Sequence, residues 1–403
     1  MKKNNRITPE GTRDYLFEEC LLRRKIEDTL SQVFVSHCYH EVVTPGFEFY
    51  DVYDPDFSGI PQEVMFKMTD RQGRLMVMRP DNTLSIARLT ATRLQNQPRP
   101  IRLYYIQPIY RSHRRLSGRS NENVQMGVEL LGAGGLRADL EAIALAVESL
   151  SGCVPGFRLE LGHAGIFRTL AGCLPETGGV REDVREAVEA KNTALLGRLL
   201  AGRPDCPEIR ALRELPRLFG GEEVFEKASG LCAGKLRRTL DYLHGLYRAL
   251  SGFGLGNRLI VDLGLVQRND YYTGVVFSAY VEEYGDAVLL GGRYDNLLGH
   301  FGQAMPAVGF GISIDAVERT LSGGDGARAV SPADVLVFGE KGSEVRALER
   351  ISKLAAQGLR CESSVFSTRA ETLEYAGAAG ISCVDVVAGE KVETIRFDTE
   401  EKP

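Results

Sequence analysis

Residues 123–131 read as a strand that carries polar side chains at alternate positions. Successive side chains of a strand point to opposite faces of its sheet, so Gln125, Gly127 and Glu129 share one face. A preceding extended segment ends in Arg111, and a hairpin between the two would set a guanidinium beside the amide and the carboxylate. A solvated sheet face would explain the alternation by itself. The added guanidinium favours a site for a small zwitterionic ligand.

A second group of polar side chains follows the extended segment 74–78. Asp81 could accept a hydrogen bond from an ammonium group, and Thr83 adds a hydroxyl, at a position where loops often carry binding residues. Either residue could instead cap a helix that begins at Leu84. The two roles are compatible, and both stay open at this point.

The elements that must position these residues follow from hydrophobic periodicity. Apolar residues at steps of three and four predict an amphipathic helix over residues 20–37 and another over 236–250. The further predicted helix is 314–321, and the predicted extended segments are 41–43, 74–78, 101–110, 123–131, 258–263, 273–280, 287–290 and 307–311. An α+β fold, with an antiparallel sheet backed by helices, is the simplest architecture.

Two stretches interrupt this pattern and divide the chain. Residues 165–231 are helical and charged and look like an insertion into a core that spans residues 1–325. A Gly-rich breaker at 322–326 then precedes a small C-terminal α/β domain, residues 330–403, with segments at 335–338, 344–354 and 384–387. Residues 331–403 hold nine Lys and Arg against thirteen Asp and Glu, and their net charge of −4 disfavours tRNA as a partner.

Composition bounds the class of protein. The 403 residues are 43% hydrophobic and carry a formal net charge of −5, which is ordinary for a globular protein and gives no reason to bind a polyanion. The eight cysteines lie far apart without ligand-spaced histidines, so we expect neither a metal site nor disulfides. Because no apolar run could span a bilayer, we expect no membrane association and a cytoplasmic location.

Two longer motifs carry a resemblance to a known family. The segments 265–277 (LVQRNDYYTGVVF) and 290–297 (LGGRYDNL) resemble the paired signatures of histidyl-tRNA synthetases. Pro45, the Arg79-Pro80 pair, the Arg111 hairpin and residues 308–311 follow in the order of the class II synthetase motifs. The resemblance covers residues 7 to about 321 and implies a class II aminoacyl-tRNA synthetase-like core.

The resemblance also implies a pocket for L-histidine. Glu129 would accept from an imidazole N–H, a tyrosine hydroxyl would serve the other ring nitrogen, and Asp81 would help hold the α-ammonium group. The full implied set is Asp81, Thr83, Arg111, Gln125, Glu129, Gln267, Tyr271 and Tyr272. Asp81 stands where the family usually has glutamate, so the reach of that carboxylate is slightly altered.

Departures from the family pattern fall on the groups that activate ATP. The family's catalytic arginine falls at Gln267, its ATP-contacting acid at His113 and its motif 3 arginine at Ala316. Losing one preorganised charge-stabilising group costs roughly 10²- to 10³-fold in rate, so losing two arginines should abolish adenylate synthesis. The ligand site is therefore expected to persist without the reaction site.

This pattern is similar to that of the family's non-catalytic members, the regulatory subunits of the two-subunit ATP phosphoribosyltransferase. The resemblance implies no independent catalysis, no cofactor or metal, and a homodimer that joins short-form catalytic subunits and mediates feedback regulation of histidine biosynthesis by L-histidine. The alternatives are an active histidyl-tRNA synthetase, which Gln267, Ala316 and the acidic C-terminal domain argue against, and a stand-alone histidine sensor.

Overall fold

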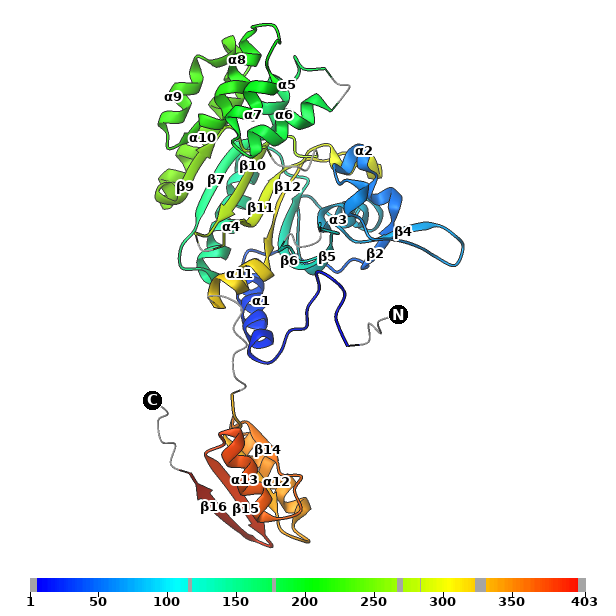
Figure 1. Cartoon of the computed structure of the whole chain (residues 1–403), viewed down its shortest axis with the longest axis vertical. Coiled ribbons are helices and arrows are strands. Elements are labelled where there is room, and N and C mark those ends of the chain that lie inside the picture. The colour runs from blue at the N-terminus through cyan, green and yellow to red at the C-terminus, as the bar shows by residue number, and fades with distance from the viewer. Residues whose placement is uncertain are drawn as a thin grey trace. The chain divides into compact units, whose positions relative to one another are not determined.

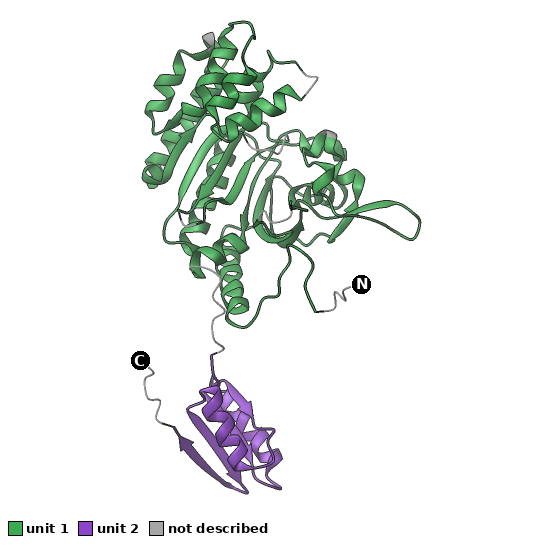
Figure 2. Ribbon diagram, viewed as in Figure 1, with its two compact units in different colours: residues 1–326 green, residues 327–403 purple. Residues whose placement is uncertain are grey.

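A computed structural model describes residues 6–114, 118–175, 179–266, 271–282, 284–322 and 331–397. The chain forms two compact units, Met1–Gly326 and Ala327–Pro403 (Figure 2). In the described parts of the chain, no helix is long and apolar enough to cross a bilayer, and no group of three or more His, Cys, Asp or Glu side chains is placed to hold a metal ion.

A nine-stranded sheet forms the centre of the first unit (Figure 1). Its strands, in spatial order, are β1 (His40–Glu41), β5 (Ile101–Tyr110), β6 (Glu122–Leu131), β12 (Ala307–Ser313), β11 (Ala287–Arg293), β10 (Val275–Tyr280), β7 (Arg158–His163), β9 (Leu259–Asp262) and β8 (Phe219–Gly220). The pairs β1–β5 and β7–β9 are parallel and the other neighbours are antiparallel. The predicted α+β class is confirmed, and so is the predicted β5–β6 hairpin, in which Gln107 lies opposite Gln125.

One face of the sheet is covered by three helices. They are α1 (Glu18–Ser36), α4 (Leu136–Cys153) and α11 (Ile314–Ser322). The predicted apolar stripe of α1 buries Ile26, Leu30 and Phe34 in the same core as Met126 and Val128 of β6. The opposite face of β6 is therefore the one left to carry polar groups, as its alternation predicted.

A smaller layer lies against that opposite face. It contains α3 (Asn82–Arg93), the short α2 (Pro55–Ser58), and a three-stranded sheet of β2 (Phe47–Phe49), β4 (Leu75–Met78) and β3 (Lys67–Thr69). Asp81 accepts from the Leu84 backbone N–H at 3.1 Å and so caps α3. The helix begins at Asn82, directly after the capping residue Asp81, and not at Leu84. The predicted capping role of Asp81 is confirmed.

The predicted helical insertion folds onto the β7–β9 side of the sheet (Figure 1). Its helices are α5 (Ala164–Ala171), α6 (Val180–Glu189), α7 (Thr193–Leu199), α8 (Pro207–Glu214) and α9 (Glu223–Ser229), followed by α10 (Arg237–Leu250). The sequence did not predict β8, a two-residue strand that joins the sheet edge beside β9. The insertion is thereby attached to the main sheet through backbone hydrogen bonds.

The second unit is a four-stranded sheet with two helices. Its strand order is β14 (Cys361–Ser363), β13 (Val335–Gly339), β15 (Cys383–Ala388) and β16 (Lys391–Arg396). The helices are α12 (Glu344–Ala355) and α13 (Arg369–Ala379), and a Thr368–Glu371 capping box begins the second. The expectation of a small α/β arrangement matches β13, α12 and β15, whereas β14, α13 and β16 were not predicted.

A buried ion pair fixes β11 to α4. The Asp139 carboxylate is fully buried and accepts from Arg293 Nε at 2.8 Å and from the Tyr242 hydroxyl. Burial raises the pKa of Asp139, and the Arg293 guanidinium opposes that rise. Arg293 belongs to the Gly-Gly-Arg-Tyr motif, so this pair also sets the position of the following residue, Tyr294, in the polar layer.

We predict that Arg293→Ala lowers the free energy of unfolding by about 3–5 kcal/mol, because it leaves the Asp139 carboxylate buried without its cation. Urea unfolding followed by circular dichroism measures the change. Arg237→Ala is the control: its partner Asp241 is 3.8 Å away and both side chains are exposed, so we expect little effect. Adding Asp139→Asn to Arg293→Ala should recover part of the loss; no recovery would show that the cost is one of packing.

Candidate functional site

A cavity of about 160 Å³ lies between the central sheet and the layer that contains α3. All the described residues of the predicted histidine site line it: Asp81, Thr83, Arg111, Gln125, Glu129, Tyr271 and Tyr272. Gln267, the remaining predicted residue, lies outside the described residues. The sequence interpretation missed the other lining residues, which are Tyr105, Glu189, Leu290, Tyr294, Gly309, Phe310 and Gly311.

The Glu129 carboxyl group is a buried acid in the lining of the cavity. Its side chain is 1% exposed and accepts from the Thr83 hydroxyl at 2.7 Å and from the Tyr294 hydroxyl. Burial raises the pKa of Glu129 to about 8, although both hydroxyls stabilise the charged form. Near neutral pH this carboxyl group is therefore protonated for much of the time. It can lose that proton when a ligand donates a hydrogen bond to the carboxylate.

Three tyrosine rings enclose the space next to Glu129. The centroid of Tyr271 lies 4.8 Å from that of Tyr272 and 5.7 Å from that of Tyr294, the latter pair edge to face. Burial holds the pKa values of Tyr271 and Tyr294 well above their usual range, so their hydroxyls remain neutral donors. An aromatic enclosure that ends in a carboxyl group suits a flat heterocycle with ring N–H groups.

Glycines on β12 supply the room that this arrangement needs. A Cβ at Gly309 would overlap Oε2 of Glu129 and the Val128 carbonyl oxygen, and one at Gly311 would meet the Tyr105 hydroxyl at 3.0 Å. Gly309 pairs directly with Glu129 across the β6–β12 ladder. Within the Val-Gly-Phe-Gly motif, Gly309 is thus explained by the volume of the buried carboxyl group and Gly311 by the nearby Tyr105 hydroxyl.

Asp81 and Arg111 form a charged pair in the lining of the cavity. Arg111 Nε donates to the Pro80 carbonyl at 2.7 Å, and its guanidinium lies 3.7 Å from the Asp81 carboxylate. Burial raises the pKa of Asp81, and the nearby Arg111 opposes the rise. A guanidinium and a carboxylate therefore lie side by side, and they are complementary to the α-carboxylate and α-ammonium groups of an amino acid.

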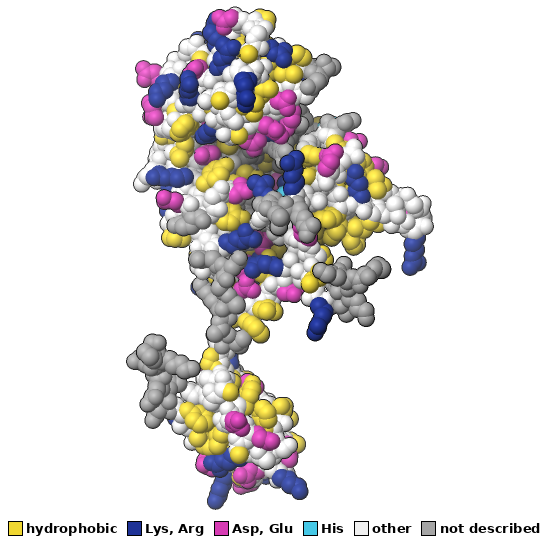
Figure 3. Space-filling view, viewed as in Figure 1, with side chains coloured by type: hydrophobic (Ala, Val, Ile, Leu, Met, Phe, Trp, Pro, Cys, Tyr) yellow, Lys and Arg dark blue, Asp and Glu magenta, His cyan; other side chains and the backbone are white. Residues whose placement is uncertain are grey.

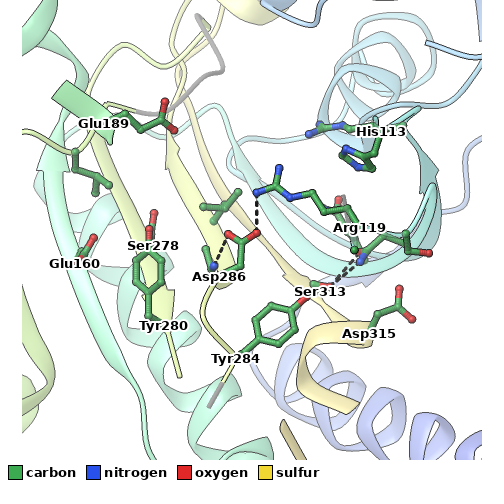
Figure 4. A pocket seen from close by; sticks show the side chains of 18 of the residues that line it. His113, Arg119, Glu160, Glu189, Ser278, Tyr280, Tyr284, Asp286, Ser313 and Asp315 are labelled. Atoms are coloured by element: carbon green, nitrogen blue, oxygen red, sulfur yellow. Dashed lines mark hydrogen bonds and ion pairs between the residues drawn. The ribbon is translucent and has the colours of Figure 1, made fainter. Parts of the chain in front are cut away.

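A larger cleft of about 770 Å³ adjoins the cavity, and residues such as Arg111 and Gln125 line both. Side chains of both signs line it: Arg119 and Asp286 meet at 3.1 Å, and Glu160 lies along the same cleft (Figure 4). Arg319 lines it as well. Figure 3 likewise shows basic and acidic side chains intermixed on the visible face of the first unit. This mixed lining is less suited to a triphosphate than a uniformly cationic one.

The groups predicted to be altered are placed as follows. Ala316 lies on the buried face of α11, in the apolar core, and Arg319, about one helical turn later, lines the cleft instead. The sequence interpretation did not consider Arg319. His113 lines the cleft, and burial together with the charges of Arg119 and Arg111 lowers its pKa. It therefore supplies no negative charge in place of the family's ATP-contacting acid.

Comparison with known proteins decides the family. The family model described as histidyl-tRNA synthetase matches residues 11–317. A protein named ATP phosphoribosyltransferase regulatory subunit from Clostridium kluyveri is 37% identical over 373 residues, which cover 91% of this chain and 95% of that protein. One of the same name from Clostridium botulinum is 34% identical and covers 97% of this chain. The chain belongs to the regulatory-subunit branch of the histidyl-tRNA synthetase family. This confirms the resemblance found in the sequence.

Solved structures agree with this placement. The crystal structure of an ATP phosphoribosyltransferase regulatory subunit/histidyl-tRNA synthetase from Bacillus halodurans matches with a TM-score of 0.83 at 28% identity, covering 96% of this chain and 100% of that one. A histidyl-tRNA synthetase from Nostoc matches with a TM-score of 0.75 at 18% identity, which shows the shared fold. The predicted class II architecture is thereby confirmed.

The pKa of Glu129 predicts how stability depends on pH. A carboxyl group whose folded-state pKa is raised to about 8 binds more protons in the folded than in the unfolded chain between pH 4.5 and 8. The free energy of unfolding should therefore fall as pH rises through this window, by up to about 1.4 kcal/mol per pH unit from this residue. Denaturant titrations of the parent and of Glu129→Gln test this, since the variant should lose that part of the slope. Equal slopes would contradict the prediction.

The altered cleft predicts an inactive adenylation site. We expect no histidine-dependent exchange of pyrophosphate into ATP from the purified chain, and none from Gln267→Arg, because Ala316 and His113 still leave the triphosphate without its clamps. An active histidyl-tRNA synthetase assayed in parallel is the control. Exchange activity that co-purifies with the chain through several chromatographic steps would overturn the expectation.

Proposed function

We propose that this chain is the regulatory subunit of an ATP phosphoribosyltransferase and that it senses L-histidine in the cavity around Glu129. The observation that carries the proposal is a cavity whose lining suits histidine, beside a cleft that His113 lines at a position where the family has an acid. At the position of the family's motif 3 arginine, Ala316 is buried in the core and presents no charge to that cleft. The names of the relatives support the regulatory role. The chain then acts by binding rather than by catalysis.

In the proposed binding mode, the imidazole of histidine points toward Glu129 and its α-amino acid group toward Arg111. The imidazole lies among the three tyrosine rings, where its N–H donates to Glu129 and its other nitrogen accepts a hydrogen bond from a tyrosine hydroxyl. The α-ammonium group then meets Asp81, Thr83 and Gln125, and the α-carboxylate meets Arg111. An imidazole N–H favours the ionised form of Glu129, so binding at neutral pH should release the proton that this carboxyl group holds.

Inhibition follows from linkage. A ligand shifts an equilibrium between active and inactive assemblies only through its different affinity for the two. If the inactive assembly presents the cavity in its closed form, histidine binds that assembly more tightly and lowers the activity of the catalytic subunit. Activation requires the assembled interface, whereas inhibition requires the ligand as well.

The proposed assembly contains a homodimer of this chain joined to short-form catalytic subunits in the cytoplasm, without tRNA. An apolar face supports the homodimer. Phe47 and Phe49 are exposed on the three-stranded sheet, and their cross-strand partners Met78 and Met76 share that face. No metal or cofactor is proposed for this chain, and magnesium would accompany the substrates of the partner.

The decisive variant is Glu129→Ala. It should weaken histidine binding by about 1.5–3 kcal/mol, the usual contribution of a hydrogen bond to a charged group, and raise the histidine concentration needed for inhibition. Activation of the catalytic subunit should remain. Glu122→Ala, on the same strand but bonded to the Tyr110 hydroxyl outside the cavity, is the matched control. Calorimetry and inhibition curves give the two readouts.

The outcomes separate the parts of the proposal. If Glu129→Ala binds histidine as tightly as the parent, the cavity is not the histidine site. If binding falls but inhibition is unchanged, the inhibitory site lies on the catalytic subunit.

A further inference from the structure

The helical insertion contributes one residue to the mouth of the histidine cavity. Among the described residues, four line both the cavity and the larger cleft: Arg111, Gln125, Glu189 and Leu290. Three of them belong to the central sheet or its hairpin. Glu189 is the last residue of α6, far away in the sequence, and Figure 4 shows its side chain directed into the cleft.

The end of α6 is held firmly against the sheet. Lys191, two residues after Glu189, has a φ of 50° and forms an ion pair at 2.8 Å with Asp262, a buried residue of β9. The Lys191 ammonium also lies 4.2 Å above the centroid of the Phe219 ring in β8. These contacts fix where Glu189 enters the mouth, so its place there is a property of the folded core.

The Glu189 carboxylate is oriented from within its own helix. Arg185, a buried residue, donates from Nη1 to Glu189 at 2.6 Å and from Nη2 to Glu182 at 2.6 Å. One guanidinium thus faces two carboxylates, and the C-terminal end of a helix adds partial negative charge. The mouth beside Glu189 therefore favours a cation, whereas Arg111 favours an anion.

We propose that Glu189 pairs with the α-ammonium group of the bound amino acid, so that insertion helix α6 closes the mouth over the ligand. This rests on the proposed histidine function and adds a specificity determinant to it. A free α-amino group is then required for tight binding, and ligand occupancy is transmitted directly to the insertion. An α-carboxylate placed against Glu189 instead would be repelled by it.

Calorimetry with chemical analogues tests the assignment on the full chain. L-histidine and L-histidinol carry the amino group, and 3-(imidazol-4-yl)propionate lacks it. We expect Glu189→Gln to weaken the first two by about fivefold to tenfold, because a half-exposed charge pair contributes less than a buried charged hydrogen bond. The third ligand has no ammonium group to lose, so its affinity should not change. Glu182→Gln, which also removes a partner of Arg185 but lies outside both cavities, should leave all three unchanged.

Each other result counts against the proposal. An equal loss for all three ligands would mean that Glu189 acts only by holding the fold, and tighter histidine binding would mean that it faces the carboxylate. Unchanged affinities would show no contact. If the parent chain itself binds no histidine, the proposed function fails. If the parent binds histidine but Glu189→Gln gives one of these contrary results, only this inference fails.

Discussion

Burying the Glu129 carboxyl group between the central sheet and the layer that contains α3 costs free energy that its neighbours must offset. No cation approaches it among the described contacts; the Thr83 and Tyr294 hydroxyls donate to it instead. Each donor depends on another element, because Asp81 caps the helix that carries Thr83 and the Arg293–Asp139 pair fixes the strand that precedes Tyr294. Gly309 leaves the space that the carboxyl group occupies. Much of the architecture around the cavity therefore serves one buried acid.

The same sheet carries two neighbouring regions with different chemistry. The cavity retains hydrogen-bonding groups and aromatic rings matched to a small ligand, whereas the adjoining cleft mixes acidic and basic side chains. At α11 the position of the family's arginine is filled by Ala316, which packs in the apolar core. The residues that bind a ligand differ from those that stabilise the charge of the transition state. A ligand site can therefore persist after the residues needed for adenylate formation are lost.

Local patterns predicted much of this site. Alternation on β6 placed Gln125 and Glu129 on one face, and the family resemblance supplied Tyr271 and Tyr272. Tyr294 lies in a motif that the sequence singled out, yet its contact with Glu129 depends on strand pairing that periodicity does not specify. Glu189 could not be predicted, because an insertion reaches the mouth only through tertiary packing. Strand β7 was missed although Leu159 and Leu161 alternate in it, since a segment of six residues gives a weak signal.

Reconstitution tests the central claim most directly. A short-form catalytic subunit is assayed for phosphoribosyl-ATP formation with increasing amounts of this chain, first without and then with histidine. The account predicts that the rate rises to saturation at a fixed ratio of the two proteins and that histidine reverses the gain. A rate that is independent of the added chain would contradict the regulatory role.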